Sequence, residues 1–385
     1  MDYTKSPIGF KLLKVLKYLR IFGFTRTFNK VKSAYHMKKT YDVLPEIKAK
    51  NKSAHVGIIG CGNFSYSTIA YYLNKNFGAI ISGAMDKNLE RAASLCKSFK
   101  GNYYTDNADL ILEDESIDIV YIASNHATHA EFAIKALNKG KSVHIEKPPV
   151  VSYDQLNRLC NAMLQSNGSV GLGYNRPQSP LGKKIQDAID DQSGPMMINW
   201  FIAAHELEDD HWYFSPEEGG RVLGNLCHWI DYTLSIIPKE SRFPVKITPA
   251  TSNNFQNDFV VSYEFADGSL AVITMSAKGH TFEGVSERLN IHRGNVLINM
   301  SDFHTLTVKN LNRTTNYKPL YRDHGHEGAI TRSYLSRPQN KKRQNTGIAI
   351  KDFWESANLM LKTKDAIEQS KVIIANGYSS RELRE

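Results

Sequence analysis

The sequence predicts a two-domain α/β protein in which a parallel sheet precedes a sheet that is mostly antiparallel. The chain has 385 residues, more than the roughly 250–300 that one hydrophobic core usually serves. From residue 55 to about residue 176, short apolar runs alternate with longer helical patterns, which is typical of βαβ units. From about Ser179, strand patterns follow one another through turns such as Asp267-Gly268, and this indicates antiparallel pairing.

Composition places the chain among ordinary globular proteins. Apolar residues make up 41% of it and charged residues 23%, which excludes a disordered or coiled-coil chain. No apolar run approaches the ~20 residues of a membrane-spanning helix, and no secretory signal pattern precedes the first domain. The four cysteines lie far apart without a C-x-x-C pair. We therefore expect no disulfide framework, no metal site and a cytoplasmic location.

Residues 1–54 form a basic extension. Residues 1–52 hold thirteen Lys or Arg and three Asp or Glu, a balance of +10, while the whole chain carries +9 and the remainder −1. Nucleic-acid binding by the body therefore has no electrostatic support. Residues 9–22 predict a helix with basic residues on one side and an apolar stripe on the other, formed by Leu12, Val15, Leu16, Leu19 and Phe22. Either the stripe contacts an anionic membrane, or it packs on the body or a second subunit.

The first domain is expected to begin at residue 55. Apolar runs predict strands near residues 55–59, 79–85, 117–124 and 142–146, with helices near residues 88–99 and 129–140. Because helices connect consecutive strands, the strands should be parallel, with their carboxyl ends at one edge of the sheet.

A phosphate-binding fingerprint follows the first strand. Gly60 permits a tight turn, Gly62 lets the backbone approach a pyrophosphate, and Ser65 stands where the G-x-G-x-x-G pattern has its third glycine. The helix that begins near Asn63 offers its free N–H groups to the anion. The alternative is a structural glycine turn in an unrelated α/β protein.

An acidic residue, Asp86, ends the second strand. A carboxylate at that place accepts hydrogen bonds from the ribose hydroxyls and repels a 2′-phosphate, so it favours NAD. Lys87 beside it leaves room for NADP.

The second domain shows strand patterns followed by helical patterns. The strands are expected near residues 196–205, 258–265, 269–276, 287–294 and 304–308, and two closing helices near residues 351–365 and 369–378. Residues 332–346 are polar and basic, and we expect a loop there.

Three further segments carry a family resemblance. They are ASNH at residues 123–126, GKSVHIEKP at residues 140–148 and GGRVLGNLCHWIDY at residues 219–232. With the fingerprint, they resemble the Gfo/Idh/MocA oxidoreductases, named for glucose–fructose oxidoreductase and inositol dehydrogenase. The resemblance implies an NAD(P)-binding Rossmann domain over residues 55–176 and a substrate-binding α/β domain with an open, mostly antiparallel sheet over residues 177–385.

The same resemblance makes Lys147 of E-K-P and His228 after the G-G segment the acid/base residues. Oxidation of a secondary alcohol needs a base for the hydroxyl proton while hydride leaves. Lys147 follows a strand at the carboxyl edge of the sheet, where ligands bind in open α/β folds. The alternative is a solvated surface lysine, although Pro148-Pro149 favours a fixed backbone, with room for one cis bond.

His228 lies on a helix that we expect over residues 218–237, where it shares a face with Gly224, Asn225, Asp231 and Tyr232. The alternative is a hydrogen-bonded core histidine. The family commonly has Asp four residues before this histidine, where this chain has Gly224, and the subgroup with G-x-x-C-H that it resembles carries Glu where this chain has Asn225. Asn225 can hydrogen-bond a substrate hydroxyl but cannot take its proton.

The remaining candidates follow from the resemblance and from position. Arg176 could contact an anionic substrate or brace the domain junction. His205, Glu206 and His211 form an H-E-x4-H pattern, which has the wrong helical spacing for a metal site and no third ligand. The expected substrate-binding residues are Tyr174, Arg176, His205 and Asn225. The expected cofactor-binding residues are Gly60, Gly62, Asn63, Phe64, Asp86, Lys87, Ser124, Asn125, His126, His129, Glu146 and Lys147.

The sequence thus predicts an NAD(P)-dependent oxidoreductase that acts on a sugar, in particular a nucleotide sugar or related carbohydrate of surface-polysaccharide synthesis. One alternative is an enzyme that recycles bound NAD to cleave or epimerise a glycoside. Another is a catalytically silent NAD-binding sensor. We expect a homo-oligomer formed through the C-terminal sheet, with peripheral contact to the inner face of an anionic membrane through residues 9–22.

Overall fold

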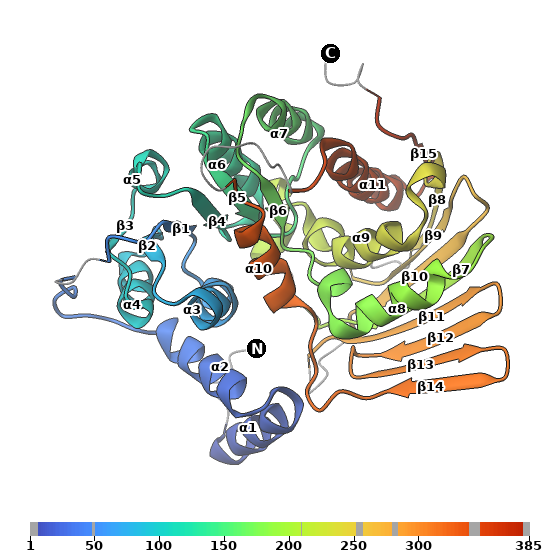
Figure 1. The fold of residues 1–385 in the computed structure, drawn as a ribbon, viewed down its shortest axis with the longest axis horizontal. Coiled ribbons are helices and arrows are strands. Elements are labelled where there is room, and N and C mark those ends of the chain that lie inside the picture. The colour runs from blue at the N-terminus through green and yellow to red at the C-terminus, as the bar shows by residue number, and fades with distance from the viewer. Residues whose placement is uncertain are drawn as a thin grey trace. The chain divides into compact units, whose positions relative to one another are not determined.

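The computed structural model of the protein describes residues 7–47, 51–208, 210–251, 257–278, 284–338 and 347–379 (Figure 1). The chain divides into two compact units. The first comprises Met1–Val150, Asp154–Gly173 and His326–Ile350, and the second comprises Val151–Tyr153, Tyr174–Gly325 and Lys351–Glu385.

The first unit is built on a six-stranded sheet of order β3-β2-β1-β4-β5-β6, and every pairing in it is parallel. The strands are β1 (Val56–Ile59), β2 (Ile81–Met85), β3 (Tyr103–Thr105), β4 (Ile119–Ile122), β5 (Ser142–Ile145) and β6 (Val170–Leu172). All residues of β1, β2, β4 and β5 are buried because helices cover both faces. This confirms the predicted Rossmann sheet.

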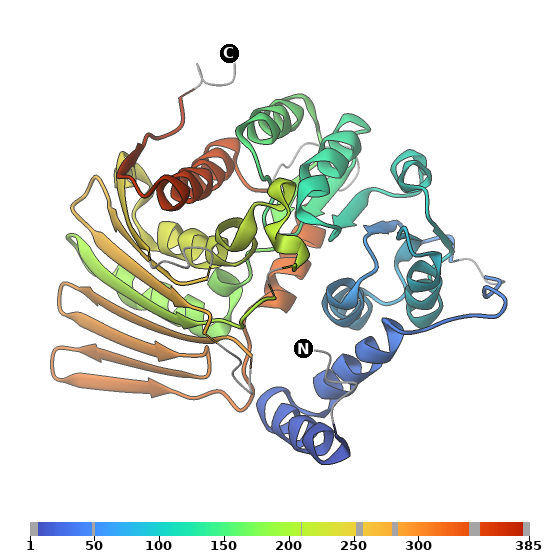
Figure 2. The same cartoon turned by 180° about the vertical axis from the view of Figure 1, so that it is seen from behind.

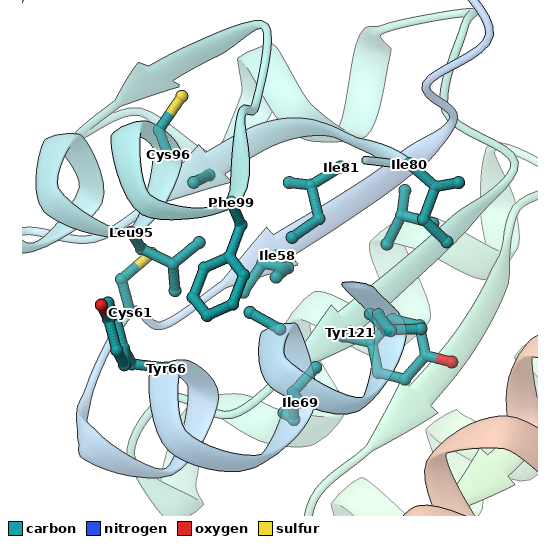
Figure 3. Close-up of a cluster of buried hydrophobic side chains, with 14 of the residues drawn as sticks. Ile58, Cys61, Tyr66, Ile69, Ile80, Ile81, Leu95, Cys96, Phe99 and Tyr121 are labelled. Atoms are coloured by element: carbon teal, nitrogen blue, oxygen red, sulfur yellow. The ribbon is translucent and has the colours of Figure 1, made fainter. Parts of the chain in front are cut away.

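The helices of this unit begin at recognisable caps and pack on the sheet. They are α3 (Tyr71–Phe77), α4 (Leu89–Phe99), α5 (Ala108–Glu113), α6 (His126–Asn138) and α7 (Tyr153–Gln165). The Asn88 side chain caps α4 by accepting from the Arg91 N–H. One core cluster joins Ile58 of β1 and Ile81 of β2 to Leu95 and Phe99 of α4, and it includes Tyr66 from the segment after the glycine turn (Figure 3).

Helix α10 (His326–Leu335) returns to the first unit. Ser333 Oγ lies 2.8 Å from His144 Nδ1, and the Tyr121 hydroxyl donates to the Ile330 carbonyl at 2.8 Å. The Ile348 N–H donates to the Val170 carbonyl at 2.9 Å. Residues 326–350 therefore leave the substrate domain to which the sequence analysis assigned them. The loop expected at residues 332–346 starts inside α10, and residues 339–346 lie outside the described part of the chain.

The basic extension folds into two helices, α1 (Ile8–Phe22) and α2 (Phe24–His36), which meet at Gly23. The helix expected over residues 9–22 is confirmed, whereas α2 had no prediction. Of the predicted stripe, Leu12 and Leu16 are exposed, whereas Val15, Leu19 and Phe22 are half-buried. Ile8 and Leu13 are exposed beside it, and Lys14 is buried. Within the described residues, no helix is long and apolar enough to cross a membrane.

The second unit carries a nine-stranded sheet of order β14-β13-β12-β11-β7-β10-β9-β8-β15. Only β7 and β10 pair in parallel among these described strands. The strands are β7 (Met196–Ala203), β8 (Val245–Thr251), β9 (Phe259–Glu264), β10 (Leu270–Ser276), β11 (Ser286–Arg293), β12 (Val296–Ser301), β13 (Thr305–Asn310), β14 (Arg313–Tyr317) and β15 (Ile373–Ala375). The mostly antiparallel sheet is confirmed.

Three helices of this unit, α8 (Pro180–Asp190), α9 (Cys227–Ile236) and α11 (Ile350–Gln369), lie on one side of the sheet (Figure 2). Burial alternates along β7, so the other face is open and exposes Met197 and Phe201. The helix expected over residues 369–378 is wrong. Helix α11 ends at Gln369, and the β-branched residues Ile373 and Ile374 pair with β8 at the edge of the sheet.

Candidate active site

The glycine turn after β1 has the geometry of a phosphate-binding loop. Gly60 has φ 88°, and a Cβ there would lie 2.5 Å from the Ala123 carbonyl oxygen, so no side chain fits. A Cβ at Gly62 would meet nothing within 4 Å. The space over Gly62 is therefore open to a ligand, and this is where a cofactor pyrophosphate fits.

Ser65, which replaces the third glycine of the G-x-G-x-x-G pattern, is buried and donates its hydroxyl proton to the Gly60 carbonyl. This contact fastens the start of the helix to the glycine turn. The expected helix begins close by, but residues Ser65–Ala70 are π-helical before α3 continues in the α conformation.

Asp86 lies where the sequence placed it, directly after β2. Its Oδ2 accepts from the Cys61 N–H at 2.7 Å, and its Oδ1 accepts from the Asn88 N–H at 2.9 Å. The carboxylate is thus fixed beside the glycine turn, in reach of a ribose bound there. Lys87 is exposed.

Helix α2 donates hydrogen bonds to the residues that follow the glycine turn, a contact that was not predicted from the sequence. Asn29 Nδ2 donates to the Ser67 carbonyl at 2.7 Å, and Arg26 donates to the same carbonyl and to Thr68 Oγ1. Ser33 Oγ donates to Asn63. Residues 26, 29, 33 and 36 recur at helical spacing, which is the one signal that could have revealed this face.

His36 completes the contact between α2 and the nucleotide loop. Its Nε2 lies 2.8 Å from the Cys61 carbonyl oxygen, its Nδ1 lies 2.9 Å from Ser94 Oγ, and its ring stacks on Tyr66 at 4.3 Å. Burial lowers the pKa of His36, which favours the neutral ring. Because a carbonyl can only accept, Nε2 carries the proton and Nδ1 accepts from the Ser94 hydroxyl.

The turn between β4 and α6 contributes Ser124, Asn125 and His126 to the same edge of the sheet. His129, one helical turn further on, is buried with Nδ1 2.8 Å from the Pro148 carbonyl and Nε2 3.1 Å from the Ser124 carbonyl. Burial lowers the pKa of His129. Its ring therefore joins the Ser124 turn to the E-K-P turn, a bracing position rather than a surface one.

The E-K-P turn follows β5. Glu146 is buried, with Oε1 3.2 Å from His144 Nε2, and a Cβ at Gly173 would lie 2.5 Å from Glu146 Oε2. Lys147 is half-buried, and the Lys147–Pro148 peptide bond is cis, as the proline pair allowed. Glu146 thus anchors the turn inside the protein, while Lys147 lies at the carboxyl edge shared with the glycine turn and Asp86.

In the second unit, the segment that carries His228 is less regular than the single helix expected over residues 218–237. A 3-10 turn (Pro216–Glu218) is followed by Gly219 and Gly220 at positive φ, a π-helical turn (Val222–Leu226) and then α9. His228 is half-buried in the first turn of α9, and its ring meets Tyr174 edge-on at 6.1 Å. Two adjacent glycines in the left-handed region explain why the helix cannot start at residue 218.

Asp231 and Tyr232 follow His228 in α9, where Asp231 is half-buried and Tyr232 is buried. Asp231 Oδ1 accepts from the Ser356 hydroxyl at 3.0 Å. Burial raises the pKa of Asp231 to about 7, and the Ser356 hydrogen bond and Arg242 oppose that rise.

The Arg176 side chain contacts other side chains of the protein. Its Nε and Nη2 donate to Glu287 at 2.7 Å and 3.2 Å, and its guanidinium lies over the Trp229 ring. Burial favours a raised pKa for Glu287, yet Arg176 and His324 lower it to about 2. These contacts hold Arg176 within the second unit. Tyr174 is likewise buried, with its hydroxyl 3.0 Å from Met360 Sδ.

Asn225 and His205 share a third residue, Arg221. Arg221 Nη1 donates to Asn225 Oδ1 at 3.3 Å, Nη2 donates to the His205 carbonyl, and Nε donates to Asn257 Oδ1 at 3.2 Å. Arg221 is 4% exposed. Arg221 lies in the segment of residues 219–232 but had no predicted role.

The first unit matches a known family. Residues 54–174 fit the oxidoreductase family with an NAD-binding Rossmann fold, whose members are the Gfo/Idh/MocA proteins. Over these residues the chain resembles the Gfo/Idh/MocA oxidoreductases. Among its curated relatives, Oxidoreductase P35 of Formosa agariphila is 32% identical over 136 residues, which are 35% of this chain and 42% of that protein.

A second relative is inositol 2-dehydrogenase of Klebsiella pneumoniae, 25% identical over 228 residues, 57% of this chain and 66% of that protein. The chain thus spans less than two thirds of these curated relatives. In fold it resembles levoglucosan dehydrogenase solved with NADH and L-sorbose, with a TM-score of 0.67 at 14% identity over 84% of this chain and 99% of that one.

Proposed function

We propose that the protein is an NAD(P)-dependent oxidoreductase that transfers hydride to or from a CH–OH group of a sugar. The observation that carries the proposal is the edge of the parallel sheet, where the open position over Gly62, the fixed Asp86 carboxylate and Lys147 lie together in one unit. Binding of a dinucleotide alone would need only the open position over Gly62 and the Asp86 carboxylate. Lys147 adds a group that can accept or donate a proton.

The residues of the first unit fit NAD. Gly62 and the N–H groups that follow it would hold the pyrophosphate, and Asp86 would accept from the ribose hydroxyls. When bound, the nicotinamide accepts hydride from an alcohol or returns it to a carbonyl. Because the Asp86 carboxylate repels a 2′-phosphate, we expect NAD to be preferred over NADP.

Lys147 and His228 are proposed as the acid/base pair. Oxidation of a secondary alcohol breaks one O–H and one C–H bond, and the hydroxyl proton passes to a base while the hydride leaves with its electron pair. A neutral Lys147 amine or a neutral His228 ring can take that proton. In the reductive direction the protonated form returns it to the new alkoxide.

The substrate class follows from the relatives that are named for a cyclitol and a sugar. Within that class we propose a nucleotide sugar or a related carbohydrate of surface-polysaccharide synthesis. Incubation of the full chain with NAD or NADH and a panel of sugars, sugar acids, cyclitols and nucleotide sugars, followed near about 340 nm, tests the activity. NAD binding without turnover on any of these would instead support a silent NAD-binding protein.

Two surfaces support the proposed partners. Helix α1 exposes Ile8, Leu12, Leu13 and Leu16 in a segment with a strongly positive balance, which suits peripheral contact with an anionic membrane. Sedimentation with anionic liposomes, lost on removal of residues 1–40, tests this. The open sheet face with Met197, Phe201 and Leu297 suits a second copy of the chain, and light scattering of the Phe201→Glu variant tests that.

A further inference from the structure

Arg221 is a buried cation whose direct partners among the described residues are all neutral. Its three hydrogen bonds end on the side-chain oxygens of Asn225 and Asn257 and on the His205 carbonyl. A guanidinium has five N–H donors. Among the described residues, therefore, two donors of Arg221 have no acceptor.

Two other buried arginines of this unit contact acids directly. Arg176 donates to both oxygens of Glu287, and Arg242 lies 3.5 Å from Asp352. Within the described part of the chain, no carboxylate makes such a contact with Arg221. The Asp258 carboxylate raises the pKa of Arg221 through its charge, without a hydrogen bond between the two residues. Asp258 accepts from the Ala277 N–H and lies 3.9 Å from Lys278.

Burying a cation without an anion is costly. Burial lowers the pKa of Arg221 to about 10, against the weaker opposing effects of Tyr213 and Asp258. At neutral pH the residue still carries its charge. A positive charge therefore lies inside the segment that precedes His228, and no acid among the described residues neutralises it by direct contact.

A cavity of about 120 Å³ is lined in part by Arg221, next to Gly219, Gly220 and Val222. Lys364 and Glu368 of α11 belong to the same lining and pair with each other at 2.7 Å, so their charges balance. Arg221 is the third charged residue of this lining. The cavity is several times the ~10–15 Å³ that one water needs.

We propose that this cavity is an anion subsite, in which Arg221 receives a carboxylate or phosphate group of the substrate. The inference rests on the proposed function and narrows its substrate class to acidic sugars. The two remaining N–H donors would bind the oxyanion, and the same guanidinium would hold Asn225 one helical turn before His228. Substrate charge and the site helix would thereby be linked through one side chain.

Binding of simple probes to the full chain tests the subsite without turnover. Glucuronate supplies the carboxylate, glucose 1-phosphate supplies the phosphate, and glucose is the neutral counterpart. Calorimetry should give at least about tenfold tighter binding for one of the two anions than for glucose. The better anion identifies the source of the charge. Equal binding of all three would overturn the proposal.

Two variants locate the effect on Arg221. Arg221→Gln should remove the preference for the anion, and Asn225→Asp should do the same, because it places a carboxylate against the guanidinium while leaving Arg221 in place. Asn225→Asp should also raise the melting temperature, which keeps the test decisive if Arg221→Gln does not fold. The control is Lys371→Gln, which removes an exposed charge of the same unit and should keep the preference.

The result separates this inference from the function on which it rests. An anion preference that depends on Arg221 would support the subsite even if no sugar is oxidised, in which case the oxidoreductase proposal fails alone. Turnover of neutral sugars, with a KM unchanged in Arg221→Gln, would overturn the subsite and leave the oxidoreductase proposal standing.

Discussion

The chain has a π-helical turn next to the glycine turn and another next to His228, and the two turns are stabilised in different ways. One spans Ser65–Ala70 after the glycine turn of the first unit, and the other spans Val222–Leu226 before His228 in the second. Turns of this type are often found at functional sites, because the extra residue frees backbone groups from the helical pattern. In both places the sequence predicted an ordinary helix.

The first π-helical turn is stabilised by hydrogen bonds from helix α2. Arg26 and Asn29 of α2 donate to the Ser67 carbonyl, and His36 donates to the Cys61 carbonyl. The second turn is held by Arg221, which directly precedes it and bonds to neutral oxygens. The glycine turn is thus fixed by residues outside its own segment, whereas the charge of Arg221 before the site helix has no acidic partner among the described residues.

The largest expected effect concerns proton transfer. Lys147→Met should lower kcat by at least about 10²-fold on an identified sugar, while NAD affinity stays within about twofold, because the amine is needed only for the proton. His228→Asn should cost a similar factor if it moves the proton and less if it only positions a hydroxyl. Steady-state kinetics with calorimetric NAD binding measures both. Full turnover in Lys147→Met would refute the E-K-P assignment.

Cofactor choice should change by a smaller factor. Asp86→Ala should reduce the preference for NAD over NADP by about tenfold, since a loss of charge repulsion of ~1.4 kcal/mol corresponds to that ratio. Asp86→Asn is the matched variant, because it retains an acceptor for the Cys61 N–H and removes only the charge. A native protein that prefers NADP in the same titration would contradict the role of Asp86.

The contact of α2 with the nucleotide loop gives a third test. His36→Ala removes the donor to the Cys61 carbonyl and should weaken NAD binding several-fold, with about 1–3 kcal/mol lost from the free energy of unfolding. His36→Gln can still donate to that carbonyl and should recover NAD affinity more than it recovers stability. If NAD binds His36→Ala as tightly as the native chain, α2 only stabilises the fold and does not position the loop.

The sequence predicted the parts of the fold that local patterns encode. Buried strands, the glycine turn, Asp86 and the E-K-P turn each have a signal within a few residues. The rest depends on distant partners: His36 lies 58 residues from Ser94, and His144 lies 189 residues from Ser333. Periodicity shows that a face is apolar or polar, but it cannot name the surface that the face meets.

The same limit explains the site residues. Arg176 looked equally suited to a substrate or to a brace, because the deciding residue, Glu287, is 111 positions away. The π-helical turns escaped prediction because their residue types suit an α-helix as well. The short strand Ile373–Ala375 was expected as a helix since only its pairing with β8 distinguishes the two.

The smallest expected effect is a pH dependence of stability from α9, next to His228. Burial raises the pKa of Asp231 from its ordinary 3.8 to about 7, so the folded protein keeps a proton there that the unfolded chain releases at lower pH. The stability from this group is complete below about pH 4 and is lost as the pH rises towards 7. Asp231→Asn should therefore gain melting temperature relative to the native chain between these limits, and Asp187→Asn, an exposed control, should not.

No carboxylate takes part in the described side-chain hydrogen bonds of the first π-helical turn, Ser65–Ala70. The variant Asn29→Ala, which removes one of these hydrogen bonds, should therefore lower the melting temperature by the same amount at every pH in this range. Parallel curves for Asp231→Asn and the native chain would show that Asp231 is ionised in the fold, and the charge next to Arg242 would then need its own account.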